Sequence, residues 1–239
     1  MKLTARSVVL SVLLGAHPAW ATAAELIRLT DDFAINDNAL RVALTRMVAA
    51  GDLIRSADGY RLSDRLLARQ QRQDEALAPR LGAWDGTWTT LVITVVGVDA
   101  KTRAGIRKTL QDTRFAELRE GVWLRPANLD VTLTDELRGR VRILLSRDGE
   151  PAALAGLLWD LPAWSATGHR LLDEMAGAQT VPQRFVVAAA MVRHLLTDPL
   201  LPAELLPRGW PGQRLRSAYR GFADELMARR DHIEVEAHR

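Results

Sequence analysis

Residues 37–50 carry side chains of the types that proteins use to contact DNA. At helical spacing, one side of this segment presents small polar and small apolar groups flanked by two arginines. That side consists of Asn38, Arg41, Val42, Thr45, Arg46 and Ala49. Small groups can contact base edges in the major groove, and arginine binds phosphate through a planar fork of donors. The pattern predicts a helix that enters the major groove.

The same segment has an apolar side and well-defined ends, as a folded helix requires. Its inward positions are Leu40, Leu44, Met47 and Val48. Asn36 is a good N-cap because its side chain can accept a hydrogen bond from the first turn. Asp37 follows where a carboxylate suits the helix dipole, and Gly51 suits the position just after the helix.

The next stretch, LIRSADGYRL at residues 53–62, predicts two short strands joined by a tight turn at Asp58-Gly59. Arg55 and Arg61 would lie on this hairpin and bind phosphates of the DNA backbone. Residues 53–73 contain five arginines and two aspartates, so this part is basic in a nearly neutral chain. An ordinary amphipathic helix beside a solvated arginine face is the simpler interpretation. The order helix, helix, capped helix, glycine and hairpin favours a winged helix-turn-helix instead.

The first 26 residues, MKLTARSVVLSVLLGAHPAWATAAEL, can be interpreted in two ways. Lys2 and Arg6, an apolar run and small residues at positions 21 and 23 are typical of a cleaved secretory signal. Alternatively, residues 7–14 form a first helix that covers the core of the winged helix-turn-helix. The core contacts would be Val8, Val9, Val12 and Leu13. We favour the helix and a cytoplasmic protein, with an exported helical protein as the alternative.

Composition excludes several classes of protein. The chain has 239 residues, 48% of them hydrophobic, which is enough for two or three compact units. It has no cysteine, hence no disulfide framework or thiolate metal site, and no other stretch apolar enough to span a membrane. The net charge is only +3, and the five histidines are scattered. Without a nucleophile elbow or a phosphate-binding glycine loop, we expect no enzymatic activity, no cofactor and no metal site.

The rest of the chain predicts an α+β fold of three domains. Residues 1–78 would form the winged helix-turn-helix. Residues 79–150 show a strand, a helix, further strand, a short helix and a strand, which is typical of a ferredoxin-like α+β domain. Residues 151–239 predict a helical C-terminal domain with proline-rich turns.

Several strings are unusual enough to indicate a family. The N-terminal part contains ARSVVLSVLLG and ALRVALTRMVAAGDLIR, the middle WDGTW and GVWLRPANL, and the C-terminal part DPLLPAELLPRGWPG. The middle and C-terminal strings are specific in combination, and the similarity spans nearly the whole chain. In these strings the chain resembles the PaaX family, the repressors of phenylacetic acid degradation.

This resemblance implies a winged-helix DNA-binding domain, a ferredoxin-like central domain and a helical C-terminal domain. It also implies a homodimer that represses transcription on palindromic double-stranded operator DNA. An aryl-acyl-CoA effector such as phenylacetyl-CoA would release it, and residues 37–50 would be the recognition helix. The residues that bind the effector are not predicted. Trp123, Trp159 and Trp164 could surround an aromatic acyl group or lie in the core.

A metal-dependent nuclease is the second alternative. The predicted central domain is similar to the small CRISPR-associated endonuclease, in which a metal-binding aspartate follows the first strand. Asp99 lies at about that place. An aspartate after a strand is also a common helix cap, and a fold by itself carries no activity. We therefore expect Asp99 to lie in a turn or to cap a helix.

Overall fold

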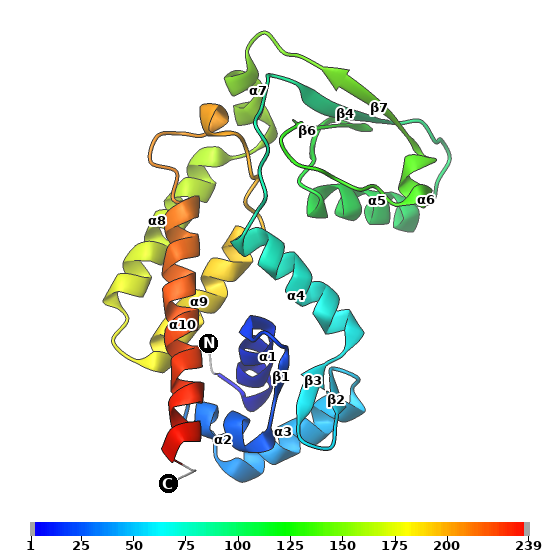
Figure 1. Ribbon diagram of the computed structural model, residues 1–239. Coiled ribbons are helices and arrows are strands. Elements are labelled where there is room, and N and C mark those ends of the chain that lie inside the picture. Colours follow the sequence, from blue (N-terminus) through cyan, green and yellow to red (C-terminus); the bar gives the residue numbers. More distant parts are fainter. Residues whose placement is uncertain (1–2, 237–239) are drawn as a thin grey trace. The chain divides into compact units, whose positions relative to one another are not determined.

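The N-terminal segment forms four helices and a small antiparallel sheet (Figure 1). The structure is a computed structural model that describes residues 3–236. The elements are α1 (Ala5–Gly15), β1 (Trp20–Ala21), α2 (Ala23–Asp31), α3 (Asp37–Ala49), β2 (Leu53–Arg55), β3 (Tyr60–Leu62) and α4 (Asp64–Leu77). The strands are ordered β1-β3-β2 and pair antiparallel.

Local side-chain chemistry fixes where these helices begin and end. The Thr22 hydroxyl accepts from the Glu25 N–H at 3.1 Å, and the Glu25 carboxylate accepts from the Thr22 N–H at 2.6 Å. Asn36 Oδ1 accepts from the Ala39 N–H at 2.8 Å and so begins α3. Gly51 follows α3 with φ +68°, a left-handed conformation that favours glycine. The caps predicted at Asn36 and Gly51 are confirmed.

Helix α1 lies in the core of this segment. It contacts α2, α3, α4 and β3. Val8, Val9 and Leu13 are fully shielded from solvent and belong to the same cluster as Leu26 and Leu44. The predicted core role of the first helix, which includes Val12 at 3% exposure, is confirmed.

A buried glutamine of α4 binds the end of α1. The Gln70 amide donates to the carbonyl oxygens of Leu13, Leu14 and Ala16 at 3.2, 3.2 and 2.9 Å. The last carbonyls of a helix have no partner within the helix, so these bonds satisfy them. The three hydrogen bonds of this buried amide therefore hold α4 against α1.

The central segment is an antiparallel sheet with helices on one face (Figure 1). Its elements are β4 (Trp88–Ile93), α5 (Ala100–Asp112), β5 (Ala116–Arg119), β6 (Val122–Pro126), α6 (Asp135–Arg138) and β7 (Val141–Ser146). The strand order is β5-β6-β4-β7. Leu91 and Trp123 pack with α5 and α6 on one face, while Trp88 and Leu124 belong to the cluster on the other.

The C-terminal third is helical, and its helices contribute to both of the compact units into which the chain divides. They are α7 (Pro151–Leu158), α8 (Leu161–Gly177), α9 (Val181–Leu195), the 3-10 turn η1 (Ala203–Leu205) and α10 (Gly212–Glu236). Unit 1 comprises residues 1–78, 168–196 and 212–239, and unit 2 comprises residues 79–167 and 197–211. The predicted α+β class is confirmed, and the division into three domains stays a prediction.

Two of the unusual strings meet inside unit 2. Arg125, only 1% exposed, donates to the carbonyl oxygens of Thr113 and Pro126, each at 3.1 Å, and to Asn128 Oδ1 at 3.3 Å. The Asn128 amide donates in turn to the Leu200 carbonyl oxygen at 3.0 Å. The string GVWLRPANL thus binds the string that begins DPLLP, across 72 positions of sequence.

Candidate nucleic-acid interface

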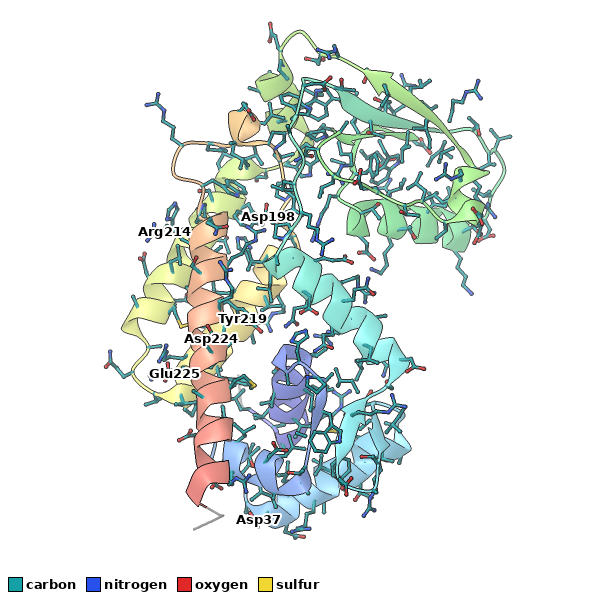
Figure 2. The ribbon with its side chains drawn as sticks, viewed as in Figure 1. Asp37, Asp198, Arg214, Tyr219, Asp224 and Glu225 are labelled. Atoms are coloured by element: carbon teal, nitrogen blue, oxygen red, sulfur yellow. The ribbon has the colours of Figure 1, made fainter. Side chains whose placement is uncertain are left out.

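The outward side of α3 is open to solvent along its length. The exposed side chains there are Asn38, Arg41, Val42, Thr45 and Arg46. On the opposite side, Leu40, Leu44 and Met47 are at most 1% exposed. Asp37 lies at the start of the helix, in its first turn (Figure 2). The structure therefore separates the side predicted to contact DNA from the side that holds the core.

The exposed groups of α3 offer the chemistry that base reading needs. The Thr45 hydroxyl donates to the Arg41 carbonyl oxygen at 3.0 Å, so the Thr45 oxygen remains available as an acceptor. Val42 is 41% exposed, which suits contact with a thymine methyl group. Within the described side chains, neither Arg41 nor Arg46 forms an ion pair. Both guanidinium groups are free to bind phosphate.

The hairpin presents its two predicted phosphate contacts on opposite faces. Strand β2 pairs with β3 so that Ile54 stands opposite Arg61, and Arg55 opposite Tyr60. Because neighbouring side chains of a strand alternate between faces, Arg55 and Arg61 point to different sides. Arg61 lies 3.9 Å from Asp64, whereas no described carboxylate pairs with Arg55. Both arginines are exposed, but the structure does not bring them to one face of the hairpin.

Asp52, which the sequence pattern did not single out, ties three parts of this segment together. Its oxygens lie 2.8 Å from Arg6 Nη2 of α1 and 2.6 Å from Arg65 Nη2 of α4. Its N–H donates to the Met47 carbonyl oxygen at the end of α3. Burial raises the pKa of Asp52, but the hydrogen bonds and charges of the two arginines outweigh burial and hold the pKa below its usual value. Arg65 is therefore already engaged within the protein.

Of the two structural roles predicted for Asp99, a turn or a helix cap, the structure shows the cap of α5. Its Oδ1 accepts from the Thr102 N–H and its Oδ2 from the Thr102 hydroxyl, both at 2.8 Å. These hydrogen bonds hold the pKa of Asp99 below its usual value. Among the side chains that the structure describes, residues 3–228, no cluster of three or more His, Asp or Glu could hold a metal ion. In the part of the chain that the structure describes, no helix is both long enough and apolar enough to cross a membrane.

The three tryptophans named as candidates for an effector site pack against protein groups in unit 2. Trp123 is 2% exposed in the core between the sheet and α5. Trp159 stacks on Trp88 with 6.5 Å between ring centroids. Trp164 stacks on Trp210 at 4.3 Å.

Known proteins resemble this chain over most of its length. Three protein-family models match successive segments. The family model described as PaaX-like protein matches residues 4–66. The model of the PaaX protein central Cas2-like domain matches residues 81–143, and the model of the PaaX-like protein C-terminal domain matches residues 162–234. The transcriptional repressor PaaX of Escherichia coli (strain K12) is 28% identical, over 80% of this chain and 69% of that protein.

A solved structure is closer in sequence. The uncharacterized protein Rv0674 from Mycobacterium tuberculosis is 66% identical and superposes with a TM-score of 0.88, over 97% of this chain and 99% of that one. Together, the three family models match successive segments from α1 to α10. On this evidence the chain belongs to the PaaX family.

Proposed function

We propose that the chain is a transcriptional repressor that binds operator DNA through a winged helix-turn-helix in residues 1–78. The observation that carries this proposal is the outward side of α3, which is exposed and free of ion pairs within the described residues while its opposite side is buried. The order α1-β1-α2-α3-β2-β3 puts a two-stranded wing directly after this helix. Family membership also indicates a regulator rather than an enzyme.

The roles of the residues follow from their chemistry. Asn38 and Thr45 would hydrogen-bond base edges, and Val42 would contact a thymine methyl. Arg41 and Arg46 flank this strip and would bind phosphates, as would Arg55 and Arg61 on the wing. Base contacts would give sequence preference, and the arginines would give affinity that falls with salt.

The test uses duplexes selected from a random pool by the wild-type chain, with binding measured by gel shift. We expect Arg41→Ala and Thr45→Ala each to weaken binding about tenfold to hundredfold, because contacts of this kind contribute roughly 1–3 kcal/mol. The matched control is Arg119→Ala, which removes an exposed arginine on β5 of unit 2 and should bind as wild type. Wild-type affinity in both α3 variants would show that α3 does not read DNA.

We further propose that the protein acts as a homodimer on palindromic DNA. Support comes from β7, which among the described residues is an edge strand paired with β4 alone. It exposes Ile143, Leu144 and Leu145, the last to 73%. Apolar side chains on an unpaired edge favour association with another copy. Sedimentation velocity should show a dimer that Leu145→Lys dissociates. A monomeric wild-type chain would refute this part of the proposal.

The proposed effector is an aryl-acyl-CoA such as phenylacetyl-CoA, which would release the repressor from DNA in the cytoplasm. The resemblance to the PaaX family supports this class of ligand, and the proposed function requires no cofactor. None of the three candidate tryptophans, however, lines the cavity that unit 1 contains. The place where such a ligand binds is therefore a separate question.

A further inference from the structure

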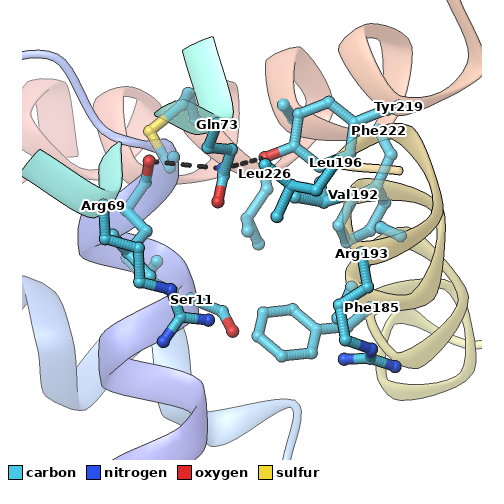
Figure 3. Close-up of a pocket in the computed structure, with 17 residues that line it drawn as sticks. Ser11, Arg69, Gln73, Phe185, Val192, Arg193, Leu196, Tyr219, Phe222 and Leu226 are labelled. Atoms are coloured by element: carbon cyan, nitrogen blue, oxygen red, sulfur yellow. Dashed lines mark hydrogen bonds between the residues drawn. The ribbon is translucent and has the colours of Figure 1, made fainter. Parts of the chain in front are cut away.

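Unit 1 contains a cavity between helices that lie far apart in the sequence (Figure 3). Helices α1 and α4 line one side of it, and α9 and α10 line the other. Its empty space is about 710 Å³, including the part that opens to solvent. All of its lining residues belong to unit 1.

The walls of the cavity are mainly apolar and partly aromatic. Phe185 and Val192 of α9 face Phe222 and Leu226 of α10 (Figure 3). The rings of Phe185 and Phe222 lie edge to face, with 6.4 Å between their centroids and 76° between their planes. A third ring can pack against such a pair through its face or its edge. The lining therefore suits a flat aromatic group.

Among the described side chains, the charged groups that line the cavity are all positive. They are Arg69 of α4 and Arg193 of α9, and no described aspartate or glutamate joins them. Figure 3 shows their guanidinium groups on opposite sides of the hollow, beside Ser11 and Phe185. Neither arginine forms an ion pair with a described side chain, whereas Arg184 of the same helix α9 pairs with Glu225. Two exposed guanidinium groups without carboxylates attract an anion.

A polar group also reaches the cavity from α10. The Tyr219 hydroxyl accepts a hydrogen bond from the Gln73 amide at 3.3 Å, and the same amide lies 3.4 Å from the Leu14 carbonyl oxygen. Burial, with the nearby charge of Asp74, raises the pKa of Tyr219, so the phenol is neutral at physiological pH. Because the oxygen accepts from Gln73, its own proton is available to an acceptor atom of a ligand.

We propose that this cavity is a ligand site for an aryl-acyl anion, with the ring packed against Phe185 and Phe222 and the negative charge at Arg69 and Arg193. The choice of the acyl class rests on the proposed function. Two ligands share this chemistry: a free aryl carboxylate, and a thioester whose phosphates lie at the open side.

Occupation of this site would act on the proposed DNA-binding segment through its supports. Helix α1 packs against α3, and α4 follows directly after strand β3 of the hairpin. Gln73 binds α1 and α10 at once. A ligand that changes the spacing between α9–α10 and α1–α4 therefore changes the support on which α3 and the wing rest.

The experiment is isothermal titration calorimetry, in which the full chain is titrated separately with phenylacetyl-CoA, phenylacetate and coenzyme A. We expect phenylacetyl-CoA to bind and coenzyme A alone to bind at least tenfold more weakly. Phenylacetate binding as tightly as the thioester would identify the carboxylate as the anion. Phenylacetate binding much more weakly would assign the anion to the phosphates. If neither phenylacetyl-CoA nor phenylacetate binds, the proposal is overturned.

Two variants place the ligand in this cavity rather than elsewhere. Ala189→Leu adds bulk to the lining, and Arg193→Gln removes one positive charge. Each should weaken binding of the best probe at least tenfold. The matched controls are Ala68→Leu and Arg220→Gln, which change exposed positions of α4 and α10 outside the cavity and should bind as wild type. Wild-type binding by both cavity variants overturns the proposal, and circular dichroism identifies a variant that has not folded.

The site and the function can fail separately. DNA binding of the wild-type chain is measured without any probe, so a chain that binds phenylacetyl-CoA but no DNA keeps the site and refutes the repressor. A chain that binds DNA but none of the probes keeps the repressor and refutes the site.

Discussion

Asp52 in unit 1 and Arg125 in unit 2 are both buried charged side chains, but their partners differ. In unit 1 the carboxylate of Asp52 is 4% exposed, but its partners Arg6 and Arg65 are 61% and 68% exposed. In unit 2 the guanidinium of Arg125 is buried with no carboxylate among its partners, which are two backbone carbonyl oxygens and Asn128. The partners of Asp52 therefore lie at the surface, whereas Arg125 is enclosed by hydrogen-bond acceptors.

This difference predicts how strongly the stability of each unit depends on its buried charged residue. A charge that water reaches is screened, so its pairing contributes little to stability. A buried cation must be surrounded by acceptors, and each acceptor left without a donor costs free energy. Burial, with the nearby charge of Arg114, lowers the pKa of Arg125 to about 10, so the group is still charged at neutral pH. Unit 2 should therefore depend more on Arg125 than unit 1 depends on Asp52.

The largest effect that tests this comparison is expected in unit 2. Arg125→Met should lower the free energy of unfolding by about 3 kcal/mol, because it leaves three buried acceptors without their donor. Those acceptors are the carbonyl oxygens of Thr113 and Pro126 and the side chain of Asn128. Urea unfolding followed by tryptophan fluorescence measures it, since six of the seven tryptophans lie in unit 2.

The control for this prediction is Arg119→Met on the neighbouring strand β5, where the arginine is exposed. Its stability should stay within about 0.5 kcal/mol of wild type. Removing a buried charge can also stabilise a protein when apolar packing replaces it. An Arg125→Met chain more stable than wild type would show that the buried network is not what holds unit 2 together.

Much of unit 1 was predictable because its signals are local. Asn36 and Gly51 mark the ends of α3 within one turn of it, and Leu40 and Leu44 repeat at helical spacing. Such patterns need only neighbouring residues, so one sequence reveals them. The exposure of Arg41 follows from the same periodicity. Its role on DNA stays a prediction.

The remaining features depend on residues that only the fold brings together. Strand β1 has two residues, too few to show alternation, and it exists because it pairs with β3. Asp52 meets Arg6 across 46 positions. The cavity in unit 1 is lined by side chains from four helices. Two of them, Arg69 and Arg193, are 124 positions apart in the sequence. No local pattern contains these contacts, so neither the Asp52 cluster nor the cavity could be predicted.

A smaller effect, with its own dependence on pH, is expected at Asp52. Since the folded state holds its pKa below the ordinary 3.8, the unfolded state binds more protons at acid pH, and stability rises with pH there. The contribution is present in full above the ordinary pKa and is lost as pH falls through the folded value. Asp52→Asn should therefore lower the free energy of unfolding by about 1 kcal/mol at pH 7, because exposed partners are screened.

Urea unfolding followed by circular dichroism at 222 nm measures this change at neutral and acid pH. The difference between Asp52→Asn and wild type should shrink as pH falls below the ordinary pKa of 3.8. Asp224→Asn, at an exposed position of α10, is the control and should match wild type at both pH values. If Asp52→Asn lowers the free energy of unfolding as much as Arg125→Met or more, the expected difference between the two units is wrong. It would mean that the tie between α1, α3 and α4 holds unit 1 as firmly as the enclosed cation holds unit 2.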